Sequence, residues 1–374
     1  HDVLQFVPDV RGCSDPNAPW ADIEAVLREV SPDVLGISSV TATFPAALRL
    51  AELAREVLGP DLTIVMGGVH STFMPDAPFR SPAIDYVVRG EGEATMTELL
   101  SALEKGRTGE GIPGLAWRGE GGEIVRGPNR PPIEDLDGLA FPEREGIVWK
   151  EALEPAFYQS IITVRGCPYK CIYCSVPASS DRKTRYRSAE NIVDEIALLK
   201  ATYDIPYLFF HDSVFTLNRK RTVALCQALM ARGLRIPFAC QTRADRIDDT
   251  LLELMRDAGC HQIFFGIESG DPDTLKRMMK KMSLDTIRRA VSSVKALGMR
   301  CTGFFMVGFP WETATQVRRT ATFSMDLGLD AVSLFSVTPL PGTALWEMSS
   351  DVSLPDAIDF RAPQVNLTQM MVIL

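Results

Sequence analysis

The sequence lacks three features that would place it in familiar classes of protein. No uninterrupted apolar run approaches the roughly 18 residues that span a bilayer, so we expect no transmembrane segment. A positive net charge is missing too: the value is −9 at pH 7, which argues against nucleic acid as a partner. The eight cysteines show no regular pairing, and no signal peptide is visible. A reducing compartment is therefore favoured over a disulfide scaffold, and we expect a cytoplasmic protein.

The most informative feature present is a run of three cysteines. Cys167, Cys171 and Cys174 have the spacing C-x3-C-x2-C, and no fourth cysteine follows closely. Thiolates bind iron–sulfur clusters, and a cluster of four irons normally takes four protein ligands. Three ligands leave one iron open, as a metal centre requires when it binds a substrate in addition to holding a fold. The motif therefore predicts redox chemistry on a small molecule bound to a cluster.

A structural zinc site is the alternative. Zinc motifs usually bring a second cysteine or histidine pair, and this chain offers none. The other cysteines and the two candidate histidines are isolated, namely Cys13, Cys226, Cys240, Cys260, Cys301, His211 and His261. The spacing favours the cluster over a zinc ion and over three unrelated buried cysteines.

The length of 374 residues suggests two domains, both of α/β class. Residues 1–105 alternate strand-like runs (34–40, 62–66, 86–88) with helical ones (44–58, 94–105), which predicts a doubly wound, Rossmann-like sheet. Ligands of such sheets bind at the carboxyl ends of the strands. The candidates there are Ser38, Ser39, Thr41, Gly67, Gly68, His70, Gly90, Glu91, Gly92 and Glu93. Residues 106–157 read as a connector with a hairpin at 115–118 and 123–126.

Residues 158–348 repeat strand and helix six times, which predicts a partial (β/α)6 barrel. The expected strands are 158–165, 207–211, 236–242, 262–267, 300–306 and 331–337, and the expected helices 188–202, 219–232, 248–258, 284–297 and 312–327. Gly259, Gly298 and Gly328 stand where glycines end helices. Residues 349–374 start a C-terminal extension, expected to be a helical cap. The chain begins at His1 and ends mid-pattern, so we expect a fragment at both ends.

The barrel region resembles the radical S-adenosylmethionine (SAM) superfamily. The resemblance rests on the cysteine motif, Glu268-Ser269 and Gly308-Phe309-Pro310. It implies a [4Fe–4S] cluster on the three cysteines, with SAM chelating the fourth iron. For the adenine of SAM, it implies contacts with Tyr173 and with the backbone at Val307, Gly308 and Phe309. For the methionine part, it implies that Asp212 holds the ammonium and that Arg243 pairs with the carboxylate in a bidentate manner. Glu268 or Ser269 would meet the ribose. The Gly-Gly-Glu that the family usually carries at the end of strand two is absent.

The whole chain resembles the cobalamin-binding class of this superfamily, in which the corrinoid tail inserts into the N-terminal sheet. The small residues at its strand ends, Ser38, Ser39, Gly67 and Gly68, would let the backbone approach a large planar ligand. The D-x-H-x-x-G motif that ligates cobalt through histidine is missing, and His70 lies in the wrong context to replace it. We therefore expect cobalamin without a protein histidine ligand; a degenerate sheet without corrinoid is the alternative.

The resemblance implies a cobalamin-dependent C-methyltransferase that uses a 5′-deoxyadenosyl radical and methylcobalamin at an unactivated carbon of a small molecule. It also implies an external electron donor of the flavodoxin or ferredoxin kind. The alternatives are oxidative cyclisation of a tetrapyrrole-type substrate, a rearrangement, or an inactive cofactor-binding fragment. A methylthiotransferase is disfavoured because Cys13 stands alone in the N-terminal region. The sequence assigns no catalytic side chain, substrate or oligomeric state.

Overall fold

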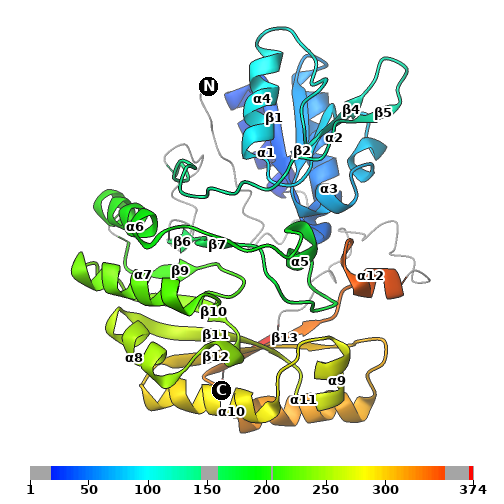
Figure 1. The fold of residues 1–374 in the computed structure, drawn as a ribbon. Helices are drawn as coiled ribbons and strands as arrows, with labels where there is room; N and C mark the ends of the chain where they lie inside the picture. Colours follow the sequence, from blue (N-terminus) through cyan, green and yellow to red (C-terminus); the bar gives the residue numbers. More distant parts are fainter. Residues whose placement is uncertain (1–17, 145–158, 204, 350–369, 374) are drawn as a thin grey trace. The chain divides into compact units, whose positions relative to one another are not determined.

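The computed structural model describes residues 18–144, 159–203, 205–349 and 370–373. Contacts divide the chain into two compact units, which we describe separately. The N-terminal unit comprises Val7–Ile133 with Pro339–Val365, and the barrel unit comprises Glu134–Thr338 with the two chain ends. Figure 1 shows most of the first in blue and cyan and most of the second in green to orange. None of the described helices is long and apolar enough to cross a membrane.

The N-terminal unit is built on a five-stranded sheet in the order β1-β2-β3-β4-β5. Its first three strands are parallel and the last two antiparallel. The strands are β1 (Val34–Ser38), β2 (Thr63–Gly67), β3 (Tyr86–Val88), β4 (Leu115–Arg118) and β5 (Ile124–Arg126). The helices are α1 (Ala18–Val30), α2 (Phe44–Leu58), α3 (Val69–Phe73) and α4 (Glu93–Leu103), with α12 (Ala344–Met348) added from the far end of the chain. The predicted doubly wound sheet is confirmed.

The sheet of this unit is covered on both faces. Ile64 and Met66 are fully buried, and Val65 between them is 2% exposed, so β2 is apolar on both sides as central parallel strands are. The hairpin that we assigned to the connector is present, but its strand β4 pairs with β3. The hairpin is therefore part of the first sheet, because Leu115 and Ala116 bury completely against its core.

The barrel unit contains a seven-stranded sheet in the order β14-β13-β12-β11-β10-β9-β6. Six strands are parallel and β14 is antiparallel. They are β6 (Ser160–Ile161), β9 (Leu208–Phe210), β10 (Phe238–Thr242), β11 (Cys260–Glu268), β12 (Arg300–Val307), β13 (Ala331–Ser336) and β14 (Met370–Ile373). Since β6 and β14 do not pair among the described residues, the barrel is open, as predicted. Residues 370–373 form a strand where we expected a helical cap; 350–369 lie outside the described residues.

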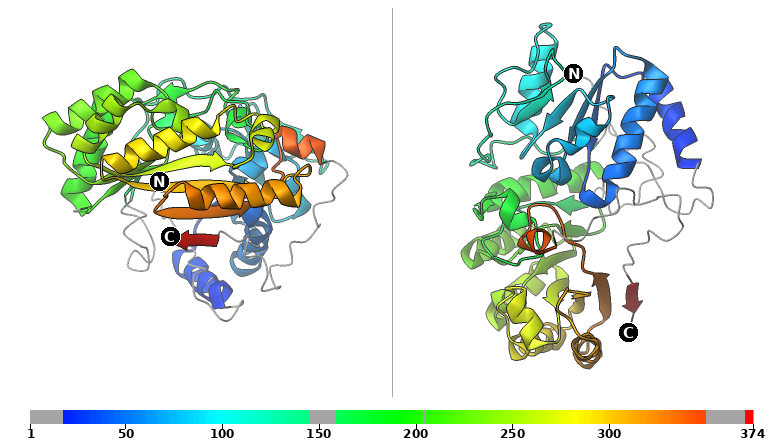
Figure 2. Two further views of the ribbon diagram at one scale, coloured as in Figure 1. Left: turned by 90° about the horizontal axis from the view of Figure 1, so that it is seen from below. Right: turned by 90° about the vertical axis from the view of Figure 1, so that its right-hand side faces the viewer.

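The longer helices cover one face of this sheet, and the short α5 lies apart from them (Figures 1 and 2). The helices are α5 (Val176–Ser179), α6 (Ala189–Tyr203), α7 (Arg219–Ala231), α8 (Asp249–Asp257), α9 (Pro272–Arg277), α10 (Leu284–Ala296) and α11 (Ala314–Asp326). Gly259, Gly298 and Gly328 follow α8, α10 and α11 with φ of 111°, 72° and 69°. The predicted C-terminal glycines are thus confirmed, because this left-handed conformation is one that glycine adopts readily.

The two faces of the barrel sheet differ in burial. Phe210, Phe265 and Phe305 are fully buried, while their neighbours along the strands, Phe209 and Phe264, are half-buried. Half-buried aromatic rings continue on the same face through Phe304 and Phe335. Successive residues of a strand point to opposite faces, so the buried set packs under the helices and the half-buried set lines the other face.

Candidate functional site

The cysteine loop leaves the barrel at the end of a short hairpin formed by β7 (Val164–Arg165) and β8 (Arg185–Tyr186). Gly166 has a φ of 89°, and a Cβ there would overlap the carbonyl oxygen of Lys183. Only glycine fits this turn, which delivers Cys167 directly after the strand. All three cysteines of the motif are free thiols; Cys167 is 7% exposed and the other two are half-buried.

The thiols lie in a low-dielectric site that carries cations. Burial raises the pKa of Cys174 to about 11 and also raises the pKa of Cys167. Arg243 and Lys280 act on Cys167 in the opposite direction. Cluster iron binds thiolates, so binding must release protons, and nearby cations favour that step.

The donor set fits a cluster better than a single metal ion. In the described part of the chain, no group of three or more His, Cys, Asp or Glu side chains could hold one ion. A structural zinc needs such convergence, whereas each cysteine of a four-iron cluster binds a different iron. The zinc alternative therefore finds no support here.

A second loop, residues 278–281, packs against the cysteine loop. The Ile172 amide donates to the Met278 carbonyl (3.2 Å), and the Arg243 guanidinium donates to the Lys280 carbonyl (2.9 Å). Lys280 itself is 5% exposed, and its ammonium lies 2.8 Å from the Glu268 carboxylate. Sequence reasoning missed Lys280, because the lysines of a Met-Met-Lys-Lys run read as a solvated turn. In the structure, strained backbone on either side marks Lys280 as unusual, since Met279 and Lys281 have φ of 59° and 50°.

Three predicted SAM contacts come together around this ion pair. Glu268 has a φ of 72°, rare for a residue with a side chain, at a register shift between β11 and β12. The Tyr173 hydroxyl donates to its carboxylate, and burial together with Glu268 raises the pKa of Tyr173. The Tyr173 ring meets Phe309 edge-on at 6.1 Å. Side chains from the cysteine loop, β11 and the end of β12 thus gather at one rim.

The backbone after β12 is partly occupied by the protein itself. Glu312, which the sequence did not single out, accepts from the amides of Gly308 (2.7 Å) and Phe309 (2.9 Å). The Val307 carbonyl accepts from the Val337 amide (2.8 Å). Trp311 stacks on Phe309 with centroids 5.0 Å apart. Any adenine contact here would involve the aromatic faces and remaining backbone groups instead of these two amides.

Two predicted SAM ligands have other partners. Arg243 is 4% exposed, and its Nε and Nη2 both donate to the Asp245 carboxylate (2.9 Å each). The predicted bidentate bond to a SAM carboxylate would have to displace Asp245. Ser269 is fully buried; its hydroxyl contacts the Thr320 hydroxyl (3.0 Å) and accepts from the Asp271 amide (3.1 Å). These contacts tie Ser269 to α11; its predicted contact with the ribose stays a prediction.

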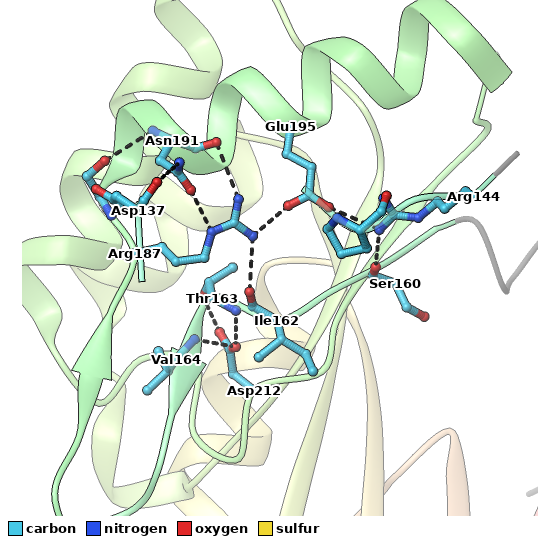
Figure 3. A network of polar contacts seen from close by, with 12 residues as sticks. Asp137, Arg144, Ser160, Ile162, Thr163, Val164, Arg187, Asn191, Glu195 and Asp212 are labelled. Atoms are coloured by element: carbon cyan, nitrogen blue, oxygen red, sulfur yellow. Dashed lines mark hydrogen bonds and ion pairs between the residues drawn. The ribbon is translucent and has the colours of Figure 1, made fainter. Parts of the chain in front are cut away.

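Asp212, which we predicted to hold the SAM ammonium, is bonded to the barrel itself. Its side chain is 1% exposed, and Oδ1 accepts from the amides of Thr163 (2.6 Å) and Val164 (2.9 Å). The Thr163 hydroxyl donates to Oδ2 (Figure 3). Both carboxylate oxygens are thus committed to the strand before the cysteine loop, which leaves no exposed acceptor for a ligand ammonium.

The predicted corrinoid residues of the N-terminal unit gather at the carboxyl ends of β1 and β2. The His70 amide donates to the Ser39 carbonyl (3.3 Å), and the His70 ring nitrogen Nδ1 lies 3.1 Å from the Thr41 hydroxyl. The His70 ring stacks on Phe44 at 4.0 Å, and burial, helped by Arg80, lowers the pKa of His70. This ring is thus held by Thr41 and Phe44 of its own unit.

This edge contains polar groups without partners. The hydroxyls of Ser39 (3% exposed) and Ser71 (fully buried) have no hydrogen-bond partner among the described residues. A Cβ at Gly68, whose φ is 94°, would lie 2.7 Å from the Ser39 amide and 3.0 Å from the Ser38 hydroxyl. Buried hydroxyls normally find partners, so a polar ligand tail fits this place.

The remaining predicted residues lie after β3. The Gly90 amide donates to the Thr72 hydroxyl (3.0 Å), and the Glu91 carboxylate accepts from the Ile133 amide (2.7 Å). Gly92 precedes α4, and Glu93 is its first residue, where a negative charge favours the helix. Glu91 thus holds the chain that leads out of this unit, a role the sequence did not indicate.

Comparison with known proteins agrees with this arrangement. The sequence matches the Radical SAM superfamily over residues 161–324 and the B12 binding domain over residues 7–100. An uncharacterized methyltransferase of Pyrococcus horikoshii is 34% identical over 330 residues, which cover 88% of this chain and 72% of that protein. An anaerobic magnesium-protoporphyrin IX monomethyl ester cyclase of Rubrivivax gelatinosus is 31% identical, with 87% of this chain and 60% of the cyclase covered.

Solved structures show the same fold. The radical SAM methyltransferase TsrM of Kitasatospora setae superposes with a TM-score of 0.76 at 22% identity, over 90% of this chain and 69% of that one. The chain belongs to the radical SAM superfamily and carries a B12 binding domain. The three-cysteine loop and these two family matches make it, more particularly, a cobalamin-dependent radical SAM enzyme, whose cofactors are a [4Fe–4S] cluster, SAM and cobalamin.

Proposed function

We propose that the protein is a C-methyltransferase acting on an unactivated carbon of a small molecule. The observation that carries the proposal is the pairing, in one chain, of an open three-cysteine loop with a B12 binding domain. Two relatives that match over most of this chain are named a methyltransferase and a methylase, the second a hopanoid C-3 methylase of Methylococcus capsulatus at 26% identity. When bound, the cluster with SAM supplies a hydrogen-abstracting radical and cobalamin supplies the methyl group.

The chain's own residues would then hold and shield these groups. Cys167, Cys171 and Cys174 hold the cluster. Tyr173, Glu268 and Phe309 form the aromatic and acidic rim for SAM, and Lys280 fixes Glu268. Ser39, Ser71 and Gly68 are proposed to receive the polar tail of the corrinoid. An external flavodoxin- or ferredoxin-like protein would deliver the electron.

We also propose domain limits that differ from those expected from sequence. The B12-binding part would extend to about residue 133, because the hairpin β4–β5 completes its sheet. The radical SAM part would begin at residue 134, since the segment 134–144 is bonded to the barrel through Asp137 and Arg144.

The half-buried aromatic face favours an apolar substrate. Phe209, Phe264, Phe304 and Phe335 form a continuous row, with ring centroids 5.4, 5.6 and 5.9 Å apart. Gln241, Thr302 and Ser333, which pair in register with members of the row, are polar but uncharged. A row of such rings binds flat or hydrocarbon groups. This supports oxidative ring closure on a tetrapyrrole-type substrate as the second candidate function.

The decisive experiment follows the methyl group of SAM. Anaerobically reconstituted protein is incubated with methyl-labelled SAM, dithionite and hydroxocobalamin. The methyltransferase proposal predicts a bound corrinoid spectrum, label on the corrinoid, and deoxyadenosine. Deoxyadenosine with an unlabelled corrinoid would favour the cyclase. Cys171→Ala should abolish deoxyadenosine, whereas Cys226→Ala, a buried cysteine outside the motif, should not.

A further inference from the structure

The strand that leads into the cysteine loop is short and weakly paired. β6 joins the main sheet through two residues at its edge, and β7 pairs with β8 through two more. Such brief ladders fix a backbone poorly by themselves. Cys167 follows Val164 by only three residues, so any displacement of this strand moves the first cluster ligand.

Side chains supply what the ladders lack. Asp212 accepts from both the Thr163 and Val164 amides, and from the Thr163 hydroxyl. On the carbonyl side three arginines donate: Arg144 to Ser160 (3.2 Å), Arg187 to Ile162 (3.2 Å) and Arg221 to Thr163 (3.1 Å). Figure 3 shows Asp212, Arg144 and Arg187 converging on this stretch from different segments of the barrel.

The arginines are themselves held in place. Glu195 of α6 is 1% exposed and pairs with Arg144 (3.0 Å) and Arg187 (2.5 Å). Arg221 of α7 also donates to the Arg187 carbonyl (3.2 Å). The arginines that donate to the carbonyls of this strand are therefore held by α6 and by one another. Among these anchors, Asp212 is the one that accepts from the amides of the strand.

We propose that Asp212 is a positioning residue, which fixes Cys167 for cluster binding by holding Thr163 and Val164, and that it does not bind SAM. The inference rests on the proposed cluster at the three cysteines. The observation behind it is geometric. Asp212 is 1% exposed, and both of its carboxylate oxygens accept from Thr163 and Val164, which shortly precede the cluster ligand Cys167.

Two substitutions separate positioning from SAM binding. In Asp212→Asn the amide oxygen can still accept from both backbone amides, and the NH2 group can donate to the Thr163 hydroxyl. This variant should lose iron to a chelator at a rate within about twofold of wild type. Asp212→Ala leaves two buried amides without an acceptor and should lose iron about tenfold faster or more. In both variants, the SAM-induced change in the electron paramagnetic resonance (EPR) spectrum of the remaining reduced cluster should persist.

The opposite pattern would overturn the inference. If Asp212 binds the SAM ammonium, Asp212→Asn and Asp212→Ala will both retain iron and both lose the SAM-induced spectral change. Equal iron retention in wild type and Asp212→Ala, with SAM binding intact, would also exclude positioning. Wild type that takes up no iron on reconstitution would instead overturn the proposed function, and the cluster-based inference with it.

Two further variants guard against a purely structural effect. Asp330 accepts from the Cys301 amide (2.7 Å) at the amino end of β12, away from the cysteine loop. Asp330→Ala therefore removes a similar bond and should lower the melting temperature while iron retention stays normal. Thr163→Val removes the hydroxyl that donates to Asp212 Oδ2 and leaves both amide bonds to Oδ1 in place. It should fold if Asp212→Ala does not, and should release iron about threefold faster than wild type; an unchanged release rate would count against the proposal.

Discussion

Lys280 and Glu268 form a buried ion pair, 2.8 Å from ammonium to carboxylate, beside the cysteine loop. Their side chains are 6% and 11% exposed, and Glu268 also accepts from Tyr173. Removing one partner leaves a buried charge uncompensated. We expect Lys280→Met or Glu268→Gln alone to lower the free energy of unfolding by about 3–5 kcal/mol, and the double variant to cost less than the two losses added.

Chemical denaturation of the cluster-free protein measures this, with an exposed pair as control. Arg219 and Asp248 lie 2.7 Å apart with side chains about half exposed. Arg219→Met should change stability little, because water screens that pair. Additive effects of Lys280→Met and Glu268→Gln would show that the two charges act independently, contrary to the geometry.

A glycine controls the entry to the cysteine loop. Gly166→Ala would place a methyl group against the Lys183 carbonyl in a backbone conformation with a φ of 89°. We expect the reconstituted variant to hold less than about a tenth of the wild-type iron, since overlap with backbone cannot be relieved locally. Gly298→Ala is the matched control: its φ is 72°, with open space around the added carbon. It should cost about 1 kcal/mol of stability and leave iron content unchanged.

Local patterns predicted the fold well, because they act within a few residues. The cysteine spacing, the alternation of strands and helices, and glycines such as Gly259 each carry their own signal. The roles of Asp212, Ser269 and Lys280 depend instead on distant chain segments. Asp212 meets Thr163, 49 positions away, so a carboxylate at a strand end could not be recognised as a backbone anchor. The pairing of the hairpin with β3 is likewise a long-range contact that local patterns do not indicate.

The Ser71 hydroxyl has no hydrogen-bond partner among the described residues, so replacing it tests whether this place binds a ligand or is a packing defect. Replacing a buried, unsatisfied hydroxyl by hydrogen costs the free protein nothing, so Ser71→Ala should leave the corrinoid-free stability unchanged or higher. If the hydroxyl binds the corrinoid tail, the same change should weaken hydroxocobalamin binding about fivefold to tenfold in a spectral titration. Ser324→Ala, which removes a 2.8 Å bond to the Ala321 carbonyl, should show the reverse: lower stability and unchanged corrinoid affinity.

Acidification should weaken the N-terminal unit through His70. Burial, then Arg80, lowers the pKa of His70 in the folded state, so the unfolded chain binds this proton more readily. The stabilisation is complete above the ordinary pKa of about 6.5 and is lost as pH falls through the lower folded value. We expect the melting temperature to drop between pH 7.5 and 5.5, and to drop less in His70→Gln. Burial also lowers the pKa of His211 and His261, so His70→Gln should remove part of the drop and leave the rest. An identical drop in His70→Gln would contradict this assignment.

The aromatic row predicts how the barrel discriminates between ligands. Phe304 lies at the middle of the row, in contact with both Phe264 and Phe335. An uncharged porphyrin ester, used as a flat apolar probe, should bind the wild type and shift its absorption band. A polycarboxylated porphyrin should bind more weakly, because its carboxylates would leave water for the uncharged rings of the row. Phe304→Ala should weaken ester binding about tenfold and Phe304→Leu less, since leucine keeps apolar area but loses ring stacking. Met325→Ala, at a side chain 63% exposed on α11, should leave the affinity unchanged. Equal binding of the two porphyrins, or no effect of Phe304→Ala, would show that the row is covered by protein and that the substrate binds elsewhere.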